Sequence, residues 1–383
     1  MRRRSRVLFV AVALFGALLA IELLISLSSS SSGPLETMLD RLASAIATAE
    51  YSVRTRAAGA GRSRHLAWFA SSRQSAEWLR QPGTVLLGSY DSRLPDRADG
   101  VVELERGLNT TFPLIQIYVA WGDRPEHAFP VRPLTTISTL GSVAVVTWEP
   151  WLSVFDPAVH PSLPLRASRD RGGLAAVARG EYDFYVDRWA AAAARFDRPF
   201  LLRFAHEMND PYRYPWGPQN NTKEEFIAAW KHVVERFRLA GAVKVIWVWS
   251  PHVAYDWWDL YYPGADSVDW VATGVLNYGP IARWSRWWTF AEIFGTHYEK
   301  LAAFGKPVMI AELGSLRVGG DRAEWFREAL TNLPARFPAV KSVLLFAASD
   351  DQTVTAQKVE WSFRDDETTL TAVRDAILPW AAR

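Results

Sequence analysis

The sequence of 383 residues contains no cysteine. Disulfide frameworks, thiolate nucleophiles and cysteine-ligated zinc or iron–sulfur sites are therefore excluded. An excess of one charge is also absent, because 43 lysines and arginines stand against 41 aspartates and glutamates. Four of the arginines lie in the first six residues, so the rest of the chain is close to neutral. A nucleic acid held by a broad basic surface is therefore not expected as a partner.

Apolar and aromatic residues, by contrast, are plentiful. Hydrophobic residues make up 49% of the chain and charged residues 22%, so most of it should fold. The length suits two ordinary domains, or one large barrel of about 250 residues with attachments. Tryptophan is the outlier, with nineteen residues, and ten of them fall between residues 216 and 288.

The N-terminal region has the pattern of a membrane anchor. Residues 7–27 are apolar except for Glu22 and follow the arginine cluster. A bilayer-spanning helix needs about 20 apolar residues, and preceding positive charges favour a cytoplasmic N-terminus. We expect residues 1–27 to form a cytoplasmic tip and transmembrane anchor, or else a cleaved signal peptide. Residues 28–83 are expected to be linker and stalk. Either reading places the rest of the chain outside the cytoplasm, held at the cell membrane or secreted.

Short runs of β-branched and apolar residues alternate with helical patterns from residue 84 onward. Eight runs are predicted strands, at residues 85–90, 114–119, 143–147, 200–204, 243–249, 268–275, 307–311 and 342–347. The clearest helical stretches are residues 174–196, 223–240, 291–304, 322–332 and 368–382. This alternation predicts an α/β fold, a (β/α)8 barrel over residues 84–383. A doubly wound open sheet is the alternative, but no glycine-rich nucleotide fingerprint follows the first strand.

Two glutamates stand where chemistry takes place in such a barrel, at the ends of strands. Glu207 follows the fourth predicted strand and Glu312 the seventh. Glycoside hydrolysis needs two carboxyl groups in one cleft, one protonated to assist the departing oxygen and one ionised to attack the anomeric carbon. A single strand-end glutamate is more often an acid in the first turn of the next helix. Two of them in one tryptophan-rich barrel favour catalysis.

Motifs around both glutamates resemble glycoside hydrolase family 26. They keep the family's order and cover roughly residues 84–347. The motifs are Trp148-Glu149-Pro150-Trp151, His206-Glu207-Met208-Asn209, Tyr214-Pro215-Trp216-Gly217, residues 226–234, Trp247-Val248-Trp249-Ser250-Pro251, Tyr262-Pro263-Gly264, Val268-Asp269-Trp270-Val271 and Ile310-Ala311-Glu312-Leu313-Gly314. The resemblance implies a (β/α)8 barrel that cleaves β-linked polysaccharides such as β-mannans, mixed-linkage β-glucans or β-1,3-xylan, with retention of anomeric configuration.

The resemblance also implies roles for individual residues. Glu207 would be the acid/base and Glu312 the nucleophile, and His206 would help to position the groups around the cleavage point. Retention requires carboxyl groups about 5–5.5 Å apart, and we expect that separation here. One departure concerns the family's tyrosine after the sixth strand, which contacts the nucleophile. Leu276 occupies its position, and Tyr278, on the same face of the strand, is the candidate substitute.

Tryptophans are expected to line the cleft, because the apolar faces of sugar rings stack on aromatic side chains. The candidates are Trp148, Trp151, Trp216, Trp249, Trp284, Trp287 and Trp288. Large aromatics that fill the core would explain about half of the nineteen. Asn277 and Tyr278 are expected to contact substrate as well.

No metal or cofactor is expected. The zinc motif His-Glu-x-x-His is absent, because Asp210 stands where the second histidine belongs. No serine nucleophile motif G-x-S-x-G precedes a helix.

The segment 314–320 and the run Asp350-Asp351-Gln352 resemble a branch of family 26 found joined to, or beside, processive family 2 glycosyltransferases. We therefore expect a retaining glycoside hydrolase that acts on glucan or mannan, with a polysaccharide as substrate and a polysaccharide synthase as a partner. The alternative is a glycan-binding accessory subunit of such a synthase or exporter that has lost hydrolysis.

Overall fold

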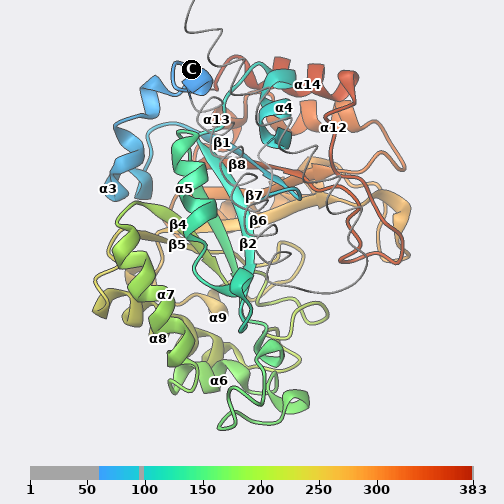
Figure 1. Cartoon of the computed structure of the whole chain (residues 1–383). Helices are drawn as coiled ribbons and strands as arrows, with labels where there is room; N and C mark the ends of the chain where they lie inside the picture. Colours follow the sequence, from blue (N-terminus) through green and yellow to red (C-terminus); the bar gives the residue numbers. More distant parts are fainter. Residues whose placement is uncertain (1–59, 95–98, 382–383) are drawn as a thin grey trace, which may run out of the picture. The chain divides into compact units, whose positions relative to one another are not determined.

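The computed structural model describes residues 60–94 and 99–381. Eight parallel strands close into a barrel in sequence order (Figure 1). They are β1 (Leu86–Asp91), β2 (Leu114–Ala120), β3 (Val143–Glu149), β4 (Phe200–Phe204), β5 (Val245–Trp249), β6 (Trp270–Asn277), β7 (Val308–Ser315) and β8 (Val340–Ala347). All eight predicted strands are present, so the (β/α)8 barrel is confirmed. The main difference is β7, which continues past residue 311 and contains Glu312.

Helices surround the barrel. They are α3 (Ala76–Arg80), α4 (Asp99–Leu108), α5 (Val131–Thr139), α6 (Gly173–Ala178), α7 (Asp183–Phe196), α8 (Lys223–Leu239), α9 (Trp258–Tyr261), α10 (Phe290–Ile293), α11 (Tyr298–Ala302), α12 (Arg322–Leu330), α13 (Leu333–Arg336) and α14 (Glu367–Ile377). The helix predicted over residues 174–196 is two helices, because Gly180 adopts a positive φ between them. In Figure 1, α4, α14 and α12 lie side by side on one flank.

Apart from a bulge in β7, side chains alternate along the strands, and this alternation divides the core into two layers. One apolar cluster fills the inside of the barrel near the amino-terminal ends of the strands. It consists of every second strand residue, such as Leu114 of β2 and Val145 of β3. The residues between them, such as Ile115 and Val146, pack outward against the helices. A residue's position in this alternation therefore decides whether it can reach the site at the open end of the barrel.

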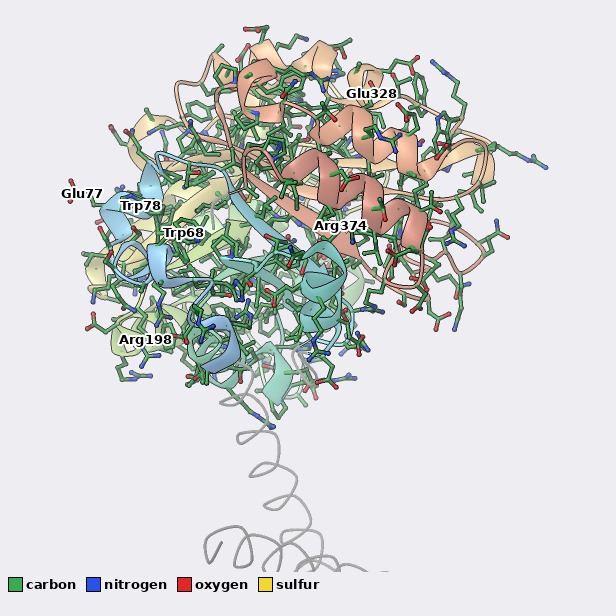
Figure 2. All side chains as sticks on the ribbon, turned by 90° about the horizontal axis from the view of Figure 1, so that it is seen from above. Trp68, Glu77, Trp78, Arg198, Glu328 and Arg374 are labelled. Atoms are coloured by element: carbon green, nitrogen blue, oxygen red, sulfur yellow. The ribbon has the colours of Figure 1, made fainter. Side chains whose placement is uncertain are left out.

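Residues 60–83 are part of the folded barrel, which corrects the predicted boundary at residue 84. Phe69 and Leu79 are buried against the apolar cluster inside the barrel. The indole N–H of Trp270 on β6 donates to the carbonyl of Leu79 at 2.9 Å. Trp68 and Trp78 lie on the same segment in Figure 2 and pack against this cluster. The segment closes the barrel at the amino-terminal ends of the strands, because Phe69 and Leu79 contact the apolar cluster at that end.

The predicted anchor, residues 1–27, lies outside the described residues. Within residues 60–94 and 99–381, no helix is both long and apolar enough to cross a bilayer. The membrane anchor and the serine-rich linker therefore remain predictions from the sequence.

A buried ion pair fastens the segment before β1 to the barrel. The guanidinium of Arg62 donates to both carboxylate oxygens of Glu105 on α4, at 2.9 and 2.6 Å. It also donates to the carbonyls of Phe112 and Leu140 and to the hydroxyl of Ser142. Every nitrogen of the guanidinium therefore donates a hydrogen bond that keeps residues 60–83 in place.

We expect Arg62→Ala to lower the free energy of unfolding by about 3–5 kcal/mol, because the change leaves the Glu105 carboxylate buried without its partner. Unfolding in guanidinium chloride, monitored by tryptophan fluorescence, measures this loss of stability. Arg64→Ala, which removes an exposed arginine from the same segment, is the control and should change stability by less than about 0.5 kcal/mol. Equal midpoints for the two variants would contradict this account of the segment.

Candidate active site

A sharp backbone turn after β4 presents Glu207. Ala205 and Glu207 both adopt positive φ, at 45° and 53°, a region that costs a non-glycine residue about 1–3 kcal/mol. Their amides are held by the neighbouring strands' ends. The N–H of Ala205 donates to the carbonyl of Trp148, and that of Glu207 to the carbonyl of Ser250 at 2.7 Å. The turn therefore fixes the direction of the Glu207 side chain, which is nearly buried.

A β-bulge in β7 turns Glu312 toward the inside of the barrel. Ile310 pairs with Val343 of β8 and Leu313 with Leu345, so three steps along β7 oppose two along β8. Met309 and Ala311 belong to the interior cluster, so strict alternation would send Glu312 outward. The extra residue of the bulge reverses its direction.

Gly274 of β6 lies between the two glutamates. A methyl group added there would stand 3.4 Å from Oε2 of Glu312 and 3.6 Å from Oε1 of Glu207. The two carboxylates therefore converge on one point at the open end of the barrel, and a glycine leaves that point free. The exact carboxyl separation required for retention stays a prediction.

The environment of Glu312 keeps it ionised. Burial by itself raises the pKa of this carboxyl, but the buried guanidinium of Arg203 and the hydroxyl of Tyr118 outweigh burial and lower it. Both groups bond Oε1, the tyrosine at 2.6 Å and the arginine through Nη2. Oε2 is left facing the gap beside Gly274. Arg203 lies on β4 and Tyr118 on β2, both in the inward positions of the alternation.

The phenol that bonds Glu312 comes from Tyr118 on β2, whereas the sequence resemblance predicted a tyrosine after β6. Leu276, at the family position, packs in an apolar cluster with Trp361 and Tyr278. Tyr278 lies one residue beyond β6 and meets Trp361 edge-on, with ring centroids 4.8 Å apart. The prediction that Tyr278 takes the place of the family tyrosine at Leu276 is therefore wrong, because Tyr118 on β2 donates the hydrogen bond to Glu312.

Glu207 is surrounded by polar and aromatic groups. Its Oε2 lies 3.4 Å from Nη1 of Arg213, which also reaches Thr353 in the loop after β8. The imidazole of His206 is buried and bonded through Nε2 to the hydroxyl of Tyr214 at 3.0 Å. Burial, with the nearby Arg203 charge, holds the pKa of His206 well below its usual value, so this ring is neutral. His206 therefore supports the Tyr214 ring beside Glu207.

A third carboxyl group, that of Glu149 at the end of β3, also faces the site. Its Oε2 accepts the indole N–H of Trp151 at 3.1 Å. Burial raises its pKa, while the Trp151 hydrogen bond and the charge of Arg203 partly offset that effect. In the sequence, Glu149 stands out only as part of the motif Trp148-Glu149-Pro150-Trp151. Its inward position in β3, two residues after Thr147, was the signal for a role in the site.

Three of the predicted sugar-stacking tryptophans are core residues instead. Trp148 and Trp249 occupy outward positions of β3 and β5 and are fully buried among helix side chains. Trp148 cannot face the cleft because its neighbour Glu149 does. Trp216 is also buried and stacks on Tyr214, with centroids 4.5 Å apart, while its N–H donates to the carbonyl of His206. It therefore supports the site from behind.

The remaining predicted contacts divide between loop packing and open surface. Asn277 is fully buried, and its side chain bonds Ser315 and the amides of Gly279 and Trp288, so it holds the loop after β6. Trp284 is 60% exposed and lies edge-on to Tyr278, which leaves a face of its indole for a sugar.

Three side chains near the site are of the types that bind metal ions. The polar atoms of Glu207, Asp210 and His252 lie within 4.8 Å of one another. Nδ1 of His252, however, accepts the N–H of Ala254 at 3.1 Å, so the neutral ring bears its hydrogen on Nε2. A metal-binding histidine needs a free lone pair on one nitrogen and usually donates from the other. The arrangement therefore suits a hydrogen-bond donor better than a ligand.

Comparison with known proteins agrees with this geometry. The family model described as glycosyl hydrolase family 26 matches residues 184–326. Endoglucanase H of Acetivibrio thermocellus is 29% identical over 257 residues, which cover 64% of this chain and 26% of that protein. The mannan endo-1,4-beta-mannosidase A and B of Caldalkalibacillus mannanilyticus is 30% identical over 121 residues, 30% of this chain and 21% of that protein. The alignments thus span about a quarter of the relatives' length.

Solved structures share the barrel. The family 26 β-mannanase from Bacteroides ovatus superposes with a TM-score of 0.57 at 14% identity, covering 80% of this chain and 92% of that one. The YdhT protein of Bacillus subtilis gives 0.53 at 16% identity, covering 79% and 89%. At identities this low, the structural similarity shows a shared fold and nothing more.

Arg203→Met should raise the pKa of Glu312, because the nearest positive charge is lost while the carboxyl stays buried. In the wild type the lowered pKa contributes stability above the unfolded-state pKa, and this contribution is lost as the pH falls through the folded value. The variant should lose that contribution. Carbon-13 NMR of labelled glutamate carboxyls measures the titration, with Glu312→Gln to assign the signal. Arg364→Met, which removes a partner of Asp91, is the control. An unchanged Glu312 titration in Arg203→Met would refute this role.

Proposed function

The chain belongs to glycoside hydrolase family 26, and on that premise we propose that it is a retaining glycosidase that cleaves β-linked polysaccharide by double displacement. The observation that supports this most directly is the convergence of Glu207 and Glu312 on the gap beside Gly274. The carboxylate of Glu312 is kept ionised, and that of Glu207 reaches the same gap.

In the first step Glu312 attacks the anomeric carbon through Oε2. Tyr118 and Arg203 occupy Oε1, so Oε2 is the oxygen free to form the bond. Glu207 donates its proton to the departing glycosidic oxygen through Oε1, because Oε2 faces Arg213. In the second step Glu207 takes a proton from water, which attacks the same carbon and releases Glu312.

The substrate we propose is a β-1,4-glucan, a mixed-linkage β-glucan or a β-mannan, cut within the chain. The relatives' names support this range, since one is an endoglucanase and another a mannan endo-1,4-β-mannosidase. The alignment with the endoglucanase is the longer of the two, which places glucans first among the substrates to test.

We also propose that the enzyme works outside the cytoplasm on an exported polysaccharide. The apolar residues 7–27 behind an arginine cluster support an anchor, with the barrel on the outer side of the membrane. A polysaccharide synthase is the partner that such a position favours. The alternative of a binding subunit without hydrolysis rested on Leu276, and the Tyr118 hydroxyl bonded to Glu312 removes that reason.

Glu312→Ala should lower kcat at least about 10⁴-fold on every polysaccharide that the wild type cleaves, because the covalent intermediate can no longer form. The effect is measured with a protein that consists of residues 35–383. Its products from β-1,4-mannan, mixed-linkage β-glucan, β-1,3-glucan and cellulose oligomers are analysed. Glu328→Ala, on the outer helix α12, should behave like the wild type. Tight binding of one glycan with no products from any would favour the accessory subunit instead.

Gly274→Ala should lower kcat/KM by about 10–100-fold while leaving the melting temperature nearly unchanged. The new methyl group makes ordinary contacts with both carboxylates, so the fold tolerates it, but it occupies the space of the anomeric carbon. Steady-state kinetics and thermal unfolding are measured on the same preparation. Full activity in this variant would show that the reaction does not take place between these two side chains.

A further inference from the structure

The end of the barrel opposite the catalytic gap carries two arginines that meet on one serine. Arg73 lies in the segment that closes the barrel, and Arg198 lies between α7 and β4. Nη1 of Arg73 donates to the carbonyl of Ser138 at 2.8 Å, and Nη1 of Arg198 donates to the hydroxyl of the same residue at 2.9 Å. Within the described residues, neither guanidinium forms an ion pair with a carboxylate.

The two charges are unfavourable for each other in this arrangement. Burial and the neighbouring charge of Arg198 both lower the pKa of Arg73. An anion between or above the two guanidinium groups would relieve this repulsion. The pair is therefore a place where a negatively charged partner is favoured.

Two further basic side chains make the pair part of a larger surface. Lys244 bonds the carboxylate of Asp197, the neighbour of Arg198 in the chain, at 2.7 Å. Arg80, at the end of α3, donates to the carbonyl of Val243, the neighbour of Lys244, at 3.0 Å. Arg198 and α3 lie on the same side of the molecule in Figure 2, where Trp78 marks this helix. These contacts join four side chains into one surface, which we call the basic patch: Arg73, Arg80, Arg198 and Lys244.

Acidic groups offset only part of this charge. Asp197 pairs with Lys244, and Asp269 pairs with Arg80 at 3.1 Å, so the other two arginines of the basic patch keep an uncompensated charge. Other exposed charges around the patch are Glu77 and Asp266 on the acidic side and Arg64, Arg195 and Arg238 on the basic side. Positive charge is therefore in excess on this face, although the chain as a whole is close to neutral.

An exposed apolar loop adjoins the basic patch. Leu239 and Val243, in the connection from α8 to β5, are 69% and 66% exposed. Arg238 precedes this run and Lys244 follows it. Apolar side chains flanked by cations suit the boundary of a lipid bilayer, because the apolar groups enter the acyl region while the cations contact the phosphates.

The course of the chain brings the same face toward a membrane. The guanidinium of Arg62 donates to the carbonyls of Phe112 and Leu140, which precede β2 and β3. The described chain therefore begins at the amino-terminal ends of the strands, where the basic patch lies. The predicted anchor comes earlier in the chain, so the residues between them lead to this end of the barrel and not to the open end.

We propose that the basic patch binds the surface of an anionic phospholipid membrane, with Arg73 and Arg198 on headgroup phosphates and with Leu239 and Val243 in the interface. Guanidinium groups suit this role, since they bond phosphate oxygens through two parallel N–H donors. The catalytic gap lies at the opposite ends of the strands. Binding to lipid therefore turns the open end of the barrel away from the bilayer, where a long polymer has access to it.

The full chain contains no cysteine, so a single introduced cysteine can carry a fluorophore that reports contact with lipid. One label is placed at Val243→Cys and the other at Val159→Cys, a valine that is 60% exposed in the loop after β3, at the open end. Each labelled chain is mixed with vesicles that contain a spin-labelled lipid as quencher. The vesicles consist of phosphatidylcholine alone or of phosphatidylcholine with about one third phosphatidylglycerol.

We expect the label at residue 243 to be quenched at least about threefold more strongly in the anionic vesicles, because the basic patch holds this loop against the lipid. The difference should fall in about 1 M salt, which screens the charges. The label at residue 159 should stay unquenched in both kinds of vesicle.

The double variant Arg73→Gln, Arg198→Gln tests the patch itself. With the label at residue 243, it should lose at least about half of the additional quenching in anionic vesicles. The matched control is Arg166→Gln, Arg171→Gln, which removes two exposed arginines from the loop after β3 and should keep the wild-type response. Thermal unfolding of both variants checks that the barrel is intact.

Equal quenching at residue 243 in the two kinds of vesicle would overturn the proposal, as would stronger quenching at residue 159. A double variant that behaves like its control would do the same. The readout needs no substrate, so it is independent of the proposed function. A chain that binds lipid but cleaves no polysaccharide would contradict only the glycosidase, and an active chain that ignores anionic lipid would contradict only this inference.

Discussion

A buried carboxylate stays ionised only if other groups compensate for its lost hydration, and Arg203 supplies the main positive charge that does this for Glu312. Without it, burial would raise the pKa of the glutamate and leave a neutral acid where the proposed mechanism needs a nucleophile. The pair also has a direction, because Arg203 and Tyr118 both bond Oε1. The other oxygen is therefore turned toward the gap at Gly274, and the chemistry of the whole site follows from that orientation.

Two backbone irregularities, one inside β7 and one just after β4, bring the two carboxylates to that gap. Glu312 points inward because of a bulge in β7, and Glu207 is held by a turn with two positive φ angles. Such features cost free energy, of the order of 1–3 kcal/mol for each left-handed residue. The closed barrel, with one packing layer inside it and one between it and the helices, offsets this cost, so the strain persists only where the surrounding hydrogen bonds leave no alternative.

The aromatic residues show why composition alone misleads. Among the tryptophans near the site in the sequence, Trp148 and Trp249 are core residues that face outward from the barrel. Trp216 supports the site from behind. In a strand, neighbouring side chains point to opposite faces, so Glu149 and Trp148 compete for the cleft and only one can face it. Strand alternation was readable in the sequence and would have favoured Tyr118, Arg203 and Glu149 over the tryptophans.

The sequence by itself determined the eight-stranded barrel and the two glutamates at strand ends, because strand and helix periodicities are local properties and the motifs are contiguous. Only the tertiary structure decided the donor for Glu312. Tyr118 lies almost two hundred residues away in the chain, and no local pattern announces a contact across the barrel. The bulge that turns Glu312 inward was equally hidden, because it depends on the register between β7 and β8. Pairings of this kind exist only once the strands have closed on one another.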